Sequence, residues 1–162
     1  MTKFIARTAL IASLYFAVTV ALSPISYGPI QFRLSECFAM LAIFFPEAVI
    51  GLTIGCFFSN LFGNGLLDIV FGTLATLLAA YTTYKACKKV HKLGKRIALA
   101  ITFNVLFNAL LVPISFATYS SAIRFYFSGI LTVGAGQLAV LSTLGIIVAY
   151  GIDRTKNNHL LK

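Results

Sequence analysis

The sequence predicts an all-α integral membrane protein with six transmembrane helices in a single domain, residues 1–162. Three observations support this fold class. Fifty-nine per cent of the residues are hydrophobic and only 10% are charged, whereas soluble domains have about 25% charged residues. The apolar residues form runs of the length that a helix needs to cross a bilayer, about 20 residues. Finally, the 13 basic residues lie mainly between these runs, and only four acidic residues are present.

Turn and helix-breaking residues divide the apolar sequence into six expected spans. The first ends before Pro24, and Pro46 separates the second from the third. Residues 63–65, Gly-Asn-Gly, indicate a tight turn before the fourth. The expected spans are residues 4–22, 34–45, 47–62, 66–85, 95–116 and 122–150.

The second and sixth spans have unusual lengths. Residues 34–45 would cover about 18 Å as an α-helix, less than the hydrocarbon core of about 30 Å. We therefore expect the preceding loop, residues 23–32, to dip into the protein, where its backbone can be satisfied. The sixth span is longer than a bilayer needs. Either its outer end stands above the membrane or it contains a break near residues 134–136, Gly-Ala-Gly.

An even number of spans places both termini on one side of the membrane. Eleven of the 13 Lys and Arg residues fall in the terminal segments and the loop at residues 85–96, and two, Arg33 and Arg124, fall on the other side. The positive-inside rule thus predicts cytoplasmic N and C termini. The same rule accounts for the net charge of +9, so we expect no nucleic-acid partner. We interpret the 85–96 loop as an orientation signal near anionic lipid, in preference to a specific docking site.

The sequence contains none of the motifs that would indicate catalysis or metal binding. It has no phosphate-binding loop, zinc-protease motif, nucleophile elbow or His/Cys cluster. Its three cysteines, Cys37, Cys56 and Cys87, lack the spacing of metal ligands. We expect no enzyme activity, no catalytic residue, no cofactor and no metal.

Acidic residues inside apolar spans are candidates for a binding site, because ionisable groups in membranes are usually functional. Glu36 and Asp68 lie in the first turns of the second and fourth spans, both near the expected outer face. Each could instead cap its helix, and Arg33 could form a buried pair with Glu36. We expect Glu47 to cap the third span and Asp153 to lie in a solvated tail.

Amide side chains within the spans add to these candidates. Asn104 and Asn108 lie four residues apart on one face of the fifth span, Asn60 lies near the outer end of the third, and Gln137 lies near the middle of the sixth. Each amide could simply bond to a neighbouring helix. Together, two carboxylates, several amides and nearby aromatic rings suit a flat, polar ligand that donates hydrogen bonds, such as a purine-like edge.

The first span carries small side chains at every fourth position. These residues are Ala9, Ser13, Ala17 and Ala21. Stripes of this kind allow two helices to approach closely in a membrane. This stripe could pack inside the bundle or dock onto another membrane protein. Gly51 and Gly55 of the third span could serve close packing over a shorter distance.

Three segments resemble a known family: residues 27–36 (YGPIQFRLSE), 46–48 (PEA) and 60–80 (NLFGNGLLDIVFGTLATLLAA). They are similar to the QueT family of queuosine-precursor transporters, and the resemblance covers nearly the whole chain. It implies a six-helix substrate-binding (S) component of an energy-coupling factor (ECF) transporter in the bacterial plasma membrane. Such a component captures a 7-deazaguanine such as preQ1 or preQ0 on the outer side. It then associates with a transmembrane coupling protein and two ATPase subunits, which hydrolyse the ATP.

The resemblance also implies roles for particular residues. The small-residue stripe would contact the coupling protein. The motif positions that would bind substrate are Gln31, Arg33, Glu36, Asn60 and Asp68. Asn104, Asn108 and Gln137 remain candidates from the residue pattern alone. Two alternatives stay open: an S component for a different vitamin, and a self-sufficient secondary carrier or channel for a small polar solute.

Overall fold

The computed structural model describes the chain except residues 28–31, 64, 118–121 and 158–162, and every regular element in the described part is helical. Most are α-helices; η1 is a 3₁₀ helix and η2 a single π-helical turn. In chain order they are α1 (Thr2–Ala21), α2 (Ser23–Ser26), η1 (Leu34–Ile43), α3 (Glu47–Gly63), α4 (Leu66–Cys87), α5 (Leu93–Ala117), α6 (Ala122–Val140), η2 (Leu141–Gly145) and α7 (Ile146–Asn157).

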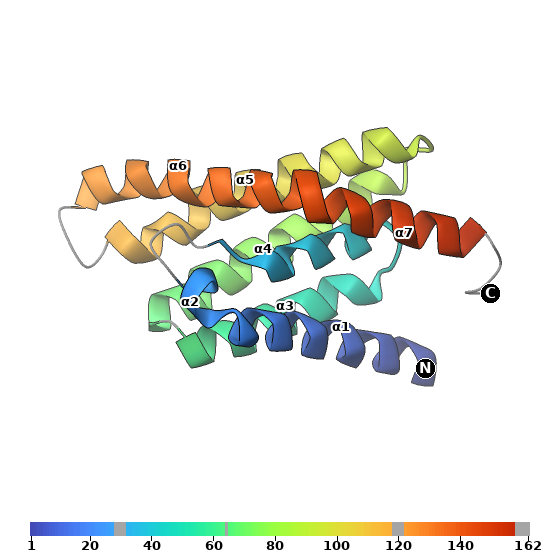
Figure 1. Ribbon diagram of the computed structural model, residues 1–162, viewed down its shortest axis with the longest axis horizontal. Coiled ribbons are helices and arrows are strands. Elements are labelled where there is room, and N and C mark those ends of the chain that lie inside the picture. The colour runs from blue at the N-terminus through green and yellow to red at the C-terminus, as the bar shows by residue number, and fades with distance from the viewer. Residues whose placement is uncertain (28–31, 64, 118–121, 158–162) are drawn as a thin grey trace.

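The long helices lie roughly parallel to one another (Figure 1), as expected for a membrane bundle. The start of α1, the connection from α4 to α5 and the end of α7 all lie at the same end of the molecule. Four segments of the described chain are long and apolar enough to cross a membrane: Thr2–Ala21, Leu66–Cys87, Leu93–Ser115 and Ile123–Lys156. η1 and α3 are apolar but shorter. The six-span count, the single domain and the cytoplasmic termini therefore stay predictions.

η1 lies at the centre of the bundle, where it packs against α1 and α3 to α7. Seven of its ten residues are buried. The sequence predicted an ordinary helix over residues 34–45, but the element is 3₁₀ and ends at Ile43. With three residues per turn, a 3₁₀ helix places residues 36, 39 and 42 in one line. Arg33, which immediately precedes the helix, lies three residues before Glu36.

The sixth expected span has no break at residues 134–136, which was one of the two alternatives suggested by its length. α6 runs unbroken through residues 134–136, and the irregular turn is η2, at Leu141–Gly145. Gly145 faces η1: a Cβ atom there would lie 3.1 Å from Cε of Met40, whereas one at Gly134 would make only an ordinary 3.5 Å contact with Ala109. The helix is thus irregular where it packs most closely against the central η1.

Close approach of α1 and α3 depends on two glycines, as the sequence indicated. A Cβ atom on Gly51 would lie 2.9 Å from the carbonyl oxygen of Thr8, and one on Gly55 would lie 2.8 Å from that of Ala12. Because these neighbours are backbone atoms, neither position can accept a side chain unless the helices separate. This contact fixes where α1 lies relative to the buried polar groups described below.

Candidate functional site

Glu36 is held at the centre of the bundle by α1. It lies in the first turn of η1 with a side chain that is 2% exposed. Its Oε1 accepts a hydrogen bond from the hydroxyl of Tyr15, which is fully buried. Its other oxygen, Oε2, is buried and has no hydrogen-bond partner in the described part of the chain. A carboxylate oxygen in that situation is costly, and it can accept a hydrogen bond from another group.

A second hydrogen bond joins α1 to η1 beside Glu36. The hydroxyl groups of Thr19 and Ser35 are 2.6 Å apart, and Thr19 donates its own proton to the carbonyl oxygen of Tyr15 at 2.7 Å. Ser35 must therefore be the donor to Thr19. Both side chains are fully buried, so the register between α1 and η1 is fixed by polar contacts as well as by packing.

Arg33, Asn60 and Asp68 form the other half of the cluster. Nη2 of Arg33 donates to Oδ1 of Asn60 at 2.7 Å, and Nδ2 of Asn60 donates to the backbone carbonyl of Asp68 at 3.0 Å. Oδ1 of Asp68 accepts from the hydroxyl of Ser115 on α5 at 2.6 Å. Arg33 interacts electrostatically with both Glu36 and Asp68. One buried cluster therefore contains four of the predicted site residues. Arg33 and Glu36 come from the start of η1, Asn60 from α3 and Asp68 from α4.

Space for the Asn60 amide is provided by Gly72 on α4. A Cβ atom at Gly72 would lie 2.7 Å from Nδ2 of Asn60. The thiol of Cys56 fills the remaining space: it accepts from Thr76 at 3.2 Å and from Asn60 at 3.4 Å. The three cysteines are buried and free. Within the described residues, no group of three His, Cys, Asp or Glu side chains could hold a metal ion.

The amides of α5 and α6 are buried but are held differently. Asn104 and Asn108 donate to the carbonyl oxygens one turn earlier in their own helix, at 2.8 and 2.9 Å. Gln137 is 7% exposed, and its Oε1 has no hydrogen-bond partner among the described residues. No hydrogen bond in the described part of the chain connects these three amides to the Arg33–Asp68 cluster. Gln31 lies outside the described residues.

Glu47, the first residue of α3, pairs with Arg7 of α1 at 3.4 Å. This ion pair was not predicted from the sequence, which suggested only a helix cap. It lies near the end of α1 remote from Tyr15 and Thr19. Glu47 is therefore a buried acid outside the cluster, and it serves below as a control.

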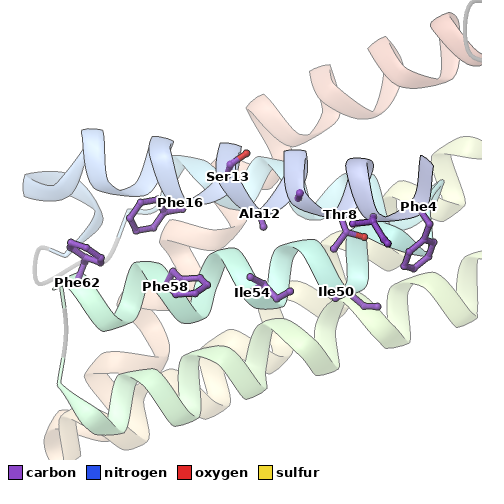
Figure 2. A pocket seen from close by; sticks show the side chains of 11 residues that line it. Phe4, Thr8, Ala12, Ser13, Phe16, Ile50, Ile54, Phe58 and Phe62 are labelled. Atoms are coloured by element: carbon purple, nitrogen blue, oxygen red, sulfur yellow. The ribbon is translucent and has the colours of Figure 1, made fainter. Parts of the chain in front are cut away.

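The small-residue stripe faces outward. Ala9, Ser13, Ala17 and Ala21 are all exposed, so the stripe does not pack inside this chain. Ala9 and Ser13 also line a groove of about 800 Å³ between α1 and α3, shown in Figure 2. The other residues lining it are mainly apolar, including Phe16, Ile54 and Phe58. This lining suits a lipid tail or another membrane helix, in contrast to the polar cluster.

Comparison with known sequences supplies the family. A family model described as QueT transporter matches residues 5–154. The chain belongs to the QueT transporter family. With its long apolar helices, this QueT family member is a multi-pass protein of the bacterial plasma membrane.

One curated relative bears the name queuosine precursor transporter QueT and comes from Lactococcus lactis subsp. cremoris (strain MG1363). It is 43% identical to this QueT-family chain over 79 residues, which are 48% of this chain and 47% of the relative. The match thus spans about half the length of the curated relative. No solved structure matches the chain significantly.

Sequence reasoning missed Tyr15, Thr19 and Ser115, although a signal for the first two was available. The buried residues of α1 are Ile11, Tyr15 and Thr19, which recur every four residues. They are offset by two positions, or about 200° around the helix, from the small-residue stripe. The two polar residues of this buried stripe, Tyr15 and Thr19, lie opposite the small-residue stripe and thus on the inner face of the helix. Nothing local to Ser115 shows that it reaches Asp68.

Proposed function

We propose that this chain is the substrate-binding S component of an ECF importer and that it captures a queuosine precursor from the outer side of the membrane. The precursor is a 7-deazaguanine such as preQ1 or preQ0. Membership of the QueT transporter family and the name of the Lactococcus relative support this proposal. The structural observation that carries it is the buried cluster of Arg33, Glu36, Asn60 and Asp68.

The chemistry of the cluster suits the guanine-like edge of the proposed ligand. A 7-deazaguanine presents a ring N–H and an exocyclic amino group side by side, and a carboxylate can accept from both. Oε2 of Glu36 is an acceptor without a partner in the described part of the chain, while Tyr15 holds the other oxygen in place. Binding would satisfy a buried group that is otherwise costly to leave unpaired.

The charges of the cluster favour a cationic ligand. Two carboxylates, Glu36 and Asp68, interact with one guanidinium, that of Arg33. An aminomethyl group such as that of preQ1 carries a positive charge at neutral pH, whereas the nitrile of preQ0 does not. We expect preQ1 to bind more tightly than preQ0.

The energy for transport would come from partner subunits. The sequence contains no phosphate-binding loop, and the small-residue stripe of α1 is exposed and free to contact a coupling protein. In this arrangement α1 binds the coupling protein through one face while its opposite face holds Glu36. The start of α1, the connection from α4 to α5 and the end of α7 lie at one end of the bundle (Figure 1), and these segments are rich in Lys and Arg, which supports cytoplasmic termini.

Titration calorimetry on the purified chain tests the substrate assignment. We expect saturable binding of preQ1, weaker binding of preQ0, and loss of binding in Glu36→Gln, which removes the charge while keeping the size of the side chain. Glu47→Gln is the matched control because it neutralises a buried acid outside the cluster. Failure of the wild-type chain to bind either deazaguanine would contradict the substrate assignment and leave an S component for another vitamin.

A transport measurement separates the S component from the self-sufficient carrier. In liposomes that contain only this chain, we expect no accumulation of preQ1 under a proton or sodium gradient. Uptake should require co-reconstitution with the coupling protein, both ATPases and ATP. Gradient-driven uptake by the chain alone would contradict the proposal.

A further inference from the structure

One face of α4 is apolar along most of its length and basic at its C-terminal end. Leu74, Leu77, Tyr81 and Lys85 follow one another at intervals of three or four residues, so they lie along one side of the helix. All four are exposed, and the three apolar residues are 38–49% exposed. None of them belongs to the Glu36 cluster or to the α1 stripe.

Two hollows lie along this face. The one towards the N-terminal half of α4 has a volume of about 340 Å³ and is lined by Phe57 of α3 and by apolar residues of α4, including Leu74 and Leu77. The one at the C-terminal end has a volume of about 460 Å³, and its lining includes Tyr81, Lys85 and Lys89. The face therefore offers an apolar surface that leads to a hollow with two amines.

Among the residues that the structure describes, the amines at this end have no carboxylate as an ion-pair partner. Nζ of Lys85 lies 5.5 Å from the centroid of the Tyr81 ring, and Nζ of Lys88 lies 4.5 Å from that of Tyr84. In the described part of the chain, no carboxylate forms an ion pair with Lys85 or Lys89. The rings hold two of the ammonium groups beside the helix, and their charge is available to an external anion.

The dimensions of this face match one leaflet of the bilayer. From Leu74 to Lys85 the helix rises about 16 Å, and half of the hydrocarbon core is about 15 Å. With the amines at the membrane surface, Leu74 and Leu77 lie at the depth of an acyl chain. Tyr81 lies between these leucines and the amines, at the level where aromatic side chains of membrane proteins gather.

We propose that this face of α4 is a binding site for an anionic phospholipid. The phosphate lies between Lys85 and Lys89, the glycerol region contacts Tyr81, and one acyl chain follows Leu77 and Leu74 towards the middle of the membrane. This site is more specific than the general attraction of basic loops to anionic lipid, because it combines two amines with an apolar path of matching length.

Native mass spectrometry of the purified chain, titrated with dioleoyl phosphatidylglycerol or dioleoyl phosphatidylcholine, tests the proposal. We expect one phosphatidylglycerol to bind in preference to phosphatidylcholine. Lys85→Gln/Lys89→Gln should lower the affinity for phosphatidylglycerol by about 25-fold, from about fivefold for each charge. The matched control, Lys92→Gln/Lys95→Gln, removes the same charge from exposed positions that do not line the hollow, and it should change the affinity little.

Three results would overturn the proposal. If both double variants lose affinity equally, the lipid responds to the summed charge of the loop and not to a site. If phosphatidylglycerol and phosphatidylcholine bind alike, the amines do not select the headgroup. A soluble glycerol phosphate should not displace the lipid, since it lacks the acyl chain; displacement would reduce the site to a phosphate site.

Binding of preQ1, measured on the same variants, should be unchanged, so this test is independent of the proposed transport function.

Discussion

Tyr15→Phe tests whether α1 positions the carboxylate that we assign to ligand binding. The substitution keeps the buried ring and removes only the hydroxyl that donates to Oε1 of Glu36. Oε2 already lacks a hydrogen-bond partner among the described residues, so the carboxylate of the variant has no donor on either oxygen there. It is then free to turn towards Arg33, with which it already interacts electrostatically.

The size of the effect follows from the bond that is lost. A hydrogen bond to a charged group contributes about 1.5–3 kcal/mol, and about 1.4 kcal/mol corresponds to a tenfold change in affinity. Returning the carboxylate to its binding position costs at most the free energy of that bond. We therefore expect the affinity for preQ1 to fall by between about tenfold and 100-fold, measured by titration calorimetry on the purified variant.

The control for this experiment is Tyr126→Phe. The hydroxyl of Tyr126 donates to the carbonyl oxygen of Leu110 at 3.1 Å, so this variant also loses one hydrogen bond from a tyrosine, but away from the cluster. Its affinity should match that of the wild-type chain. If Tyr15→Phe also binds preQ1 like the wild type, Tyr15 does not position Glu36 for the ligand and the reasoning fails.

Two further predictions concern the helices around the cluster. Gly72→Ala should push the Asn60 amide aside, because the new Cβ would lie 2.7 Å from Nδ2. We expect the affinity for preQ1 to fall about tenfold in the same calorimetric assay. The control is Gly94→Ala, because nothing lies within 4 Å of a Cβ atom at that position. Ala17→Trp should block recovery of the coupling protein and ATPases in a pull-down but leave preQ1 binding intact, whereas Leu131→Trp, at an exposed position on α6, should leave both intact. Equal recovery with both tryptophan variants would contradict a docking role for the stripe.

The sequence predicted those features that depend on local pattern. Apolar runs and turn residues located α1, α3, α4 and α5 to within two residues at each boundary, whereas the last helical segment continues to Asn157, seven residues beyond the expected end. The membrane setting followed from the scarcity of charge. The proximity of Glu36 and Asp68 was also anticipated, because both acids fall near the same expected face of the membrane. Arg33 and Asn60 were expected beside them from the family resemblance. The outward direction of the stripe was left open, since a stripe of small residues serves internal packing and docking equally well.

The features that the sequence missed depend on contacts between distant segments. The 3₁₀ geometry of η1 is not encoded by a residue type; an apolar segment of ten residues fits either kind of helix, and burial on all sides is a property of the whole bundle. The irregular turn η2 lies where Gly145 packs against Met40, about 100 residues earlier in the chain. Glycines in the sequence indicate close approach but do not tell which partner approaches.

The cluster also shows why its geometry depends on correct packing of the whole bundle. Each charged residue obtains a partner from a different helix: Glu36 from α1, Arg33 from α3 and Asp68 from α5. No single helix could hold the three charges, and a charge that lost its partner would be buried and unsatisfied. The close contact of α1 with α3 at Gly55 therefore matters to the site, because a side chain there would clash with the backbone of α1 at Ala12 and with Tyr15, and α1 would have to shift relative to α3. A substitution along the α1–α3 contact can thus disturb the proposed binding site without lying in it, and we expect it to lower both stability and the affinity for preQ1.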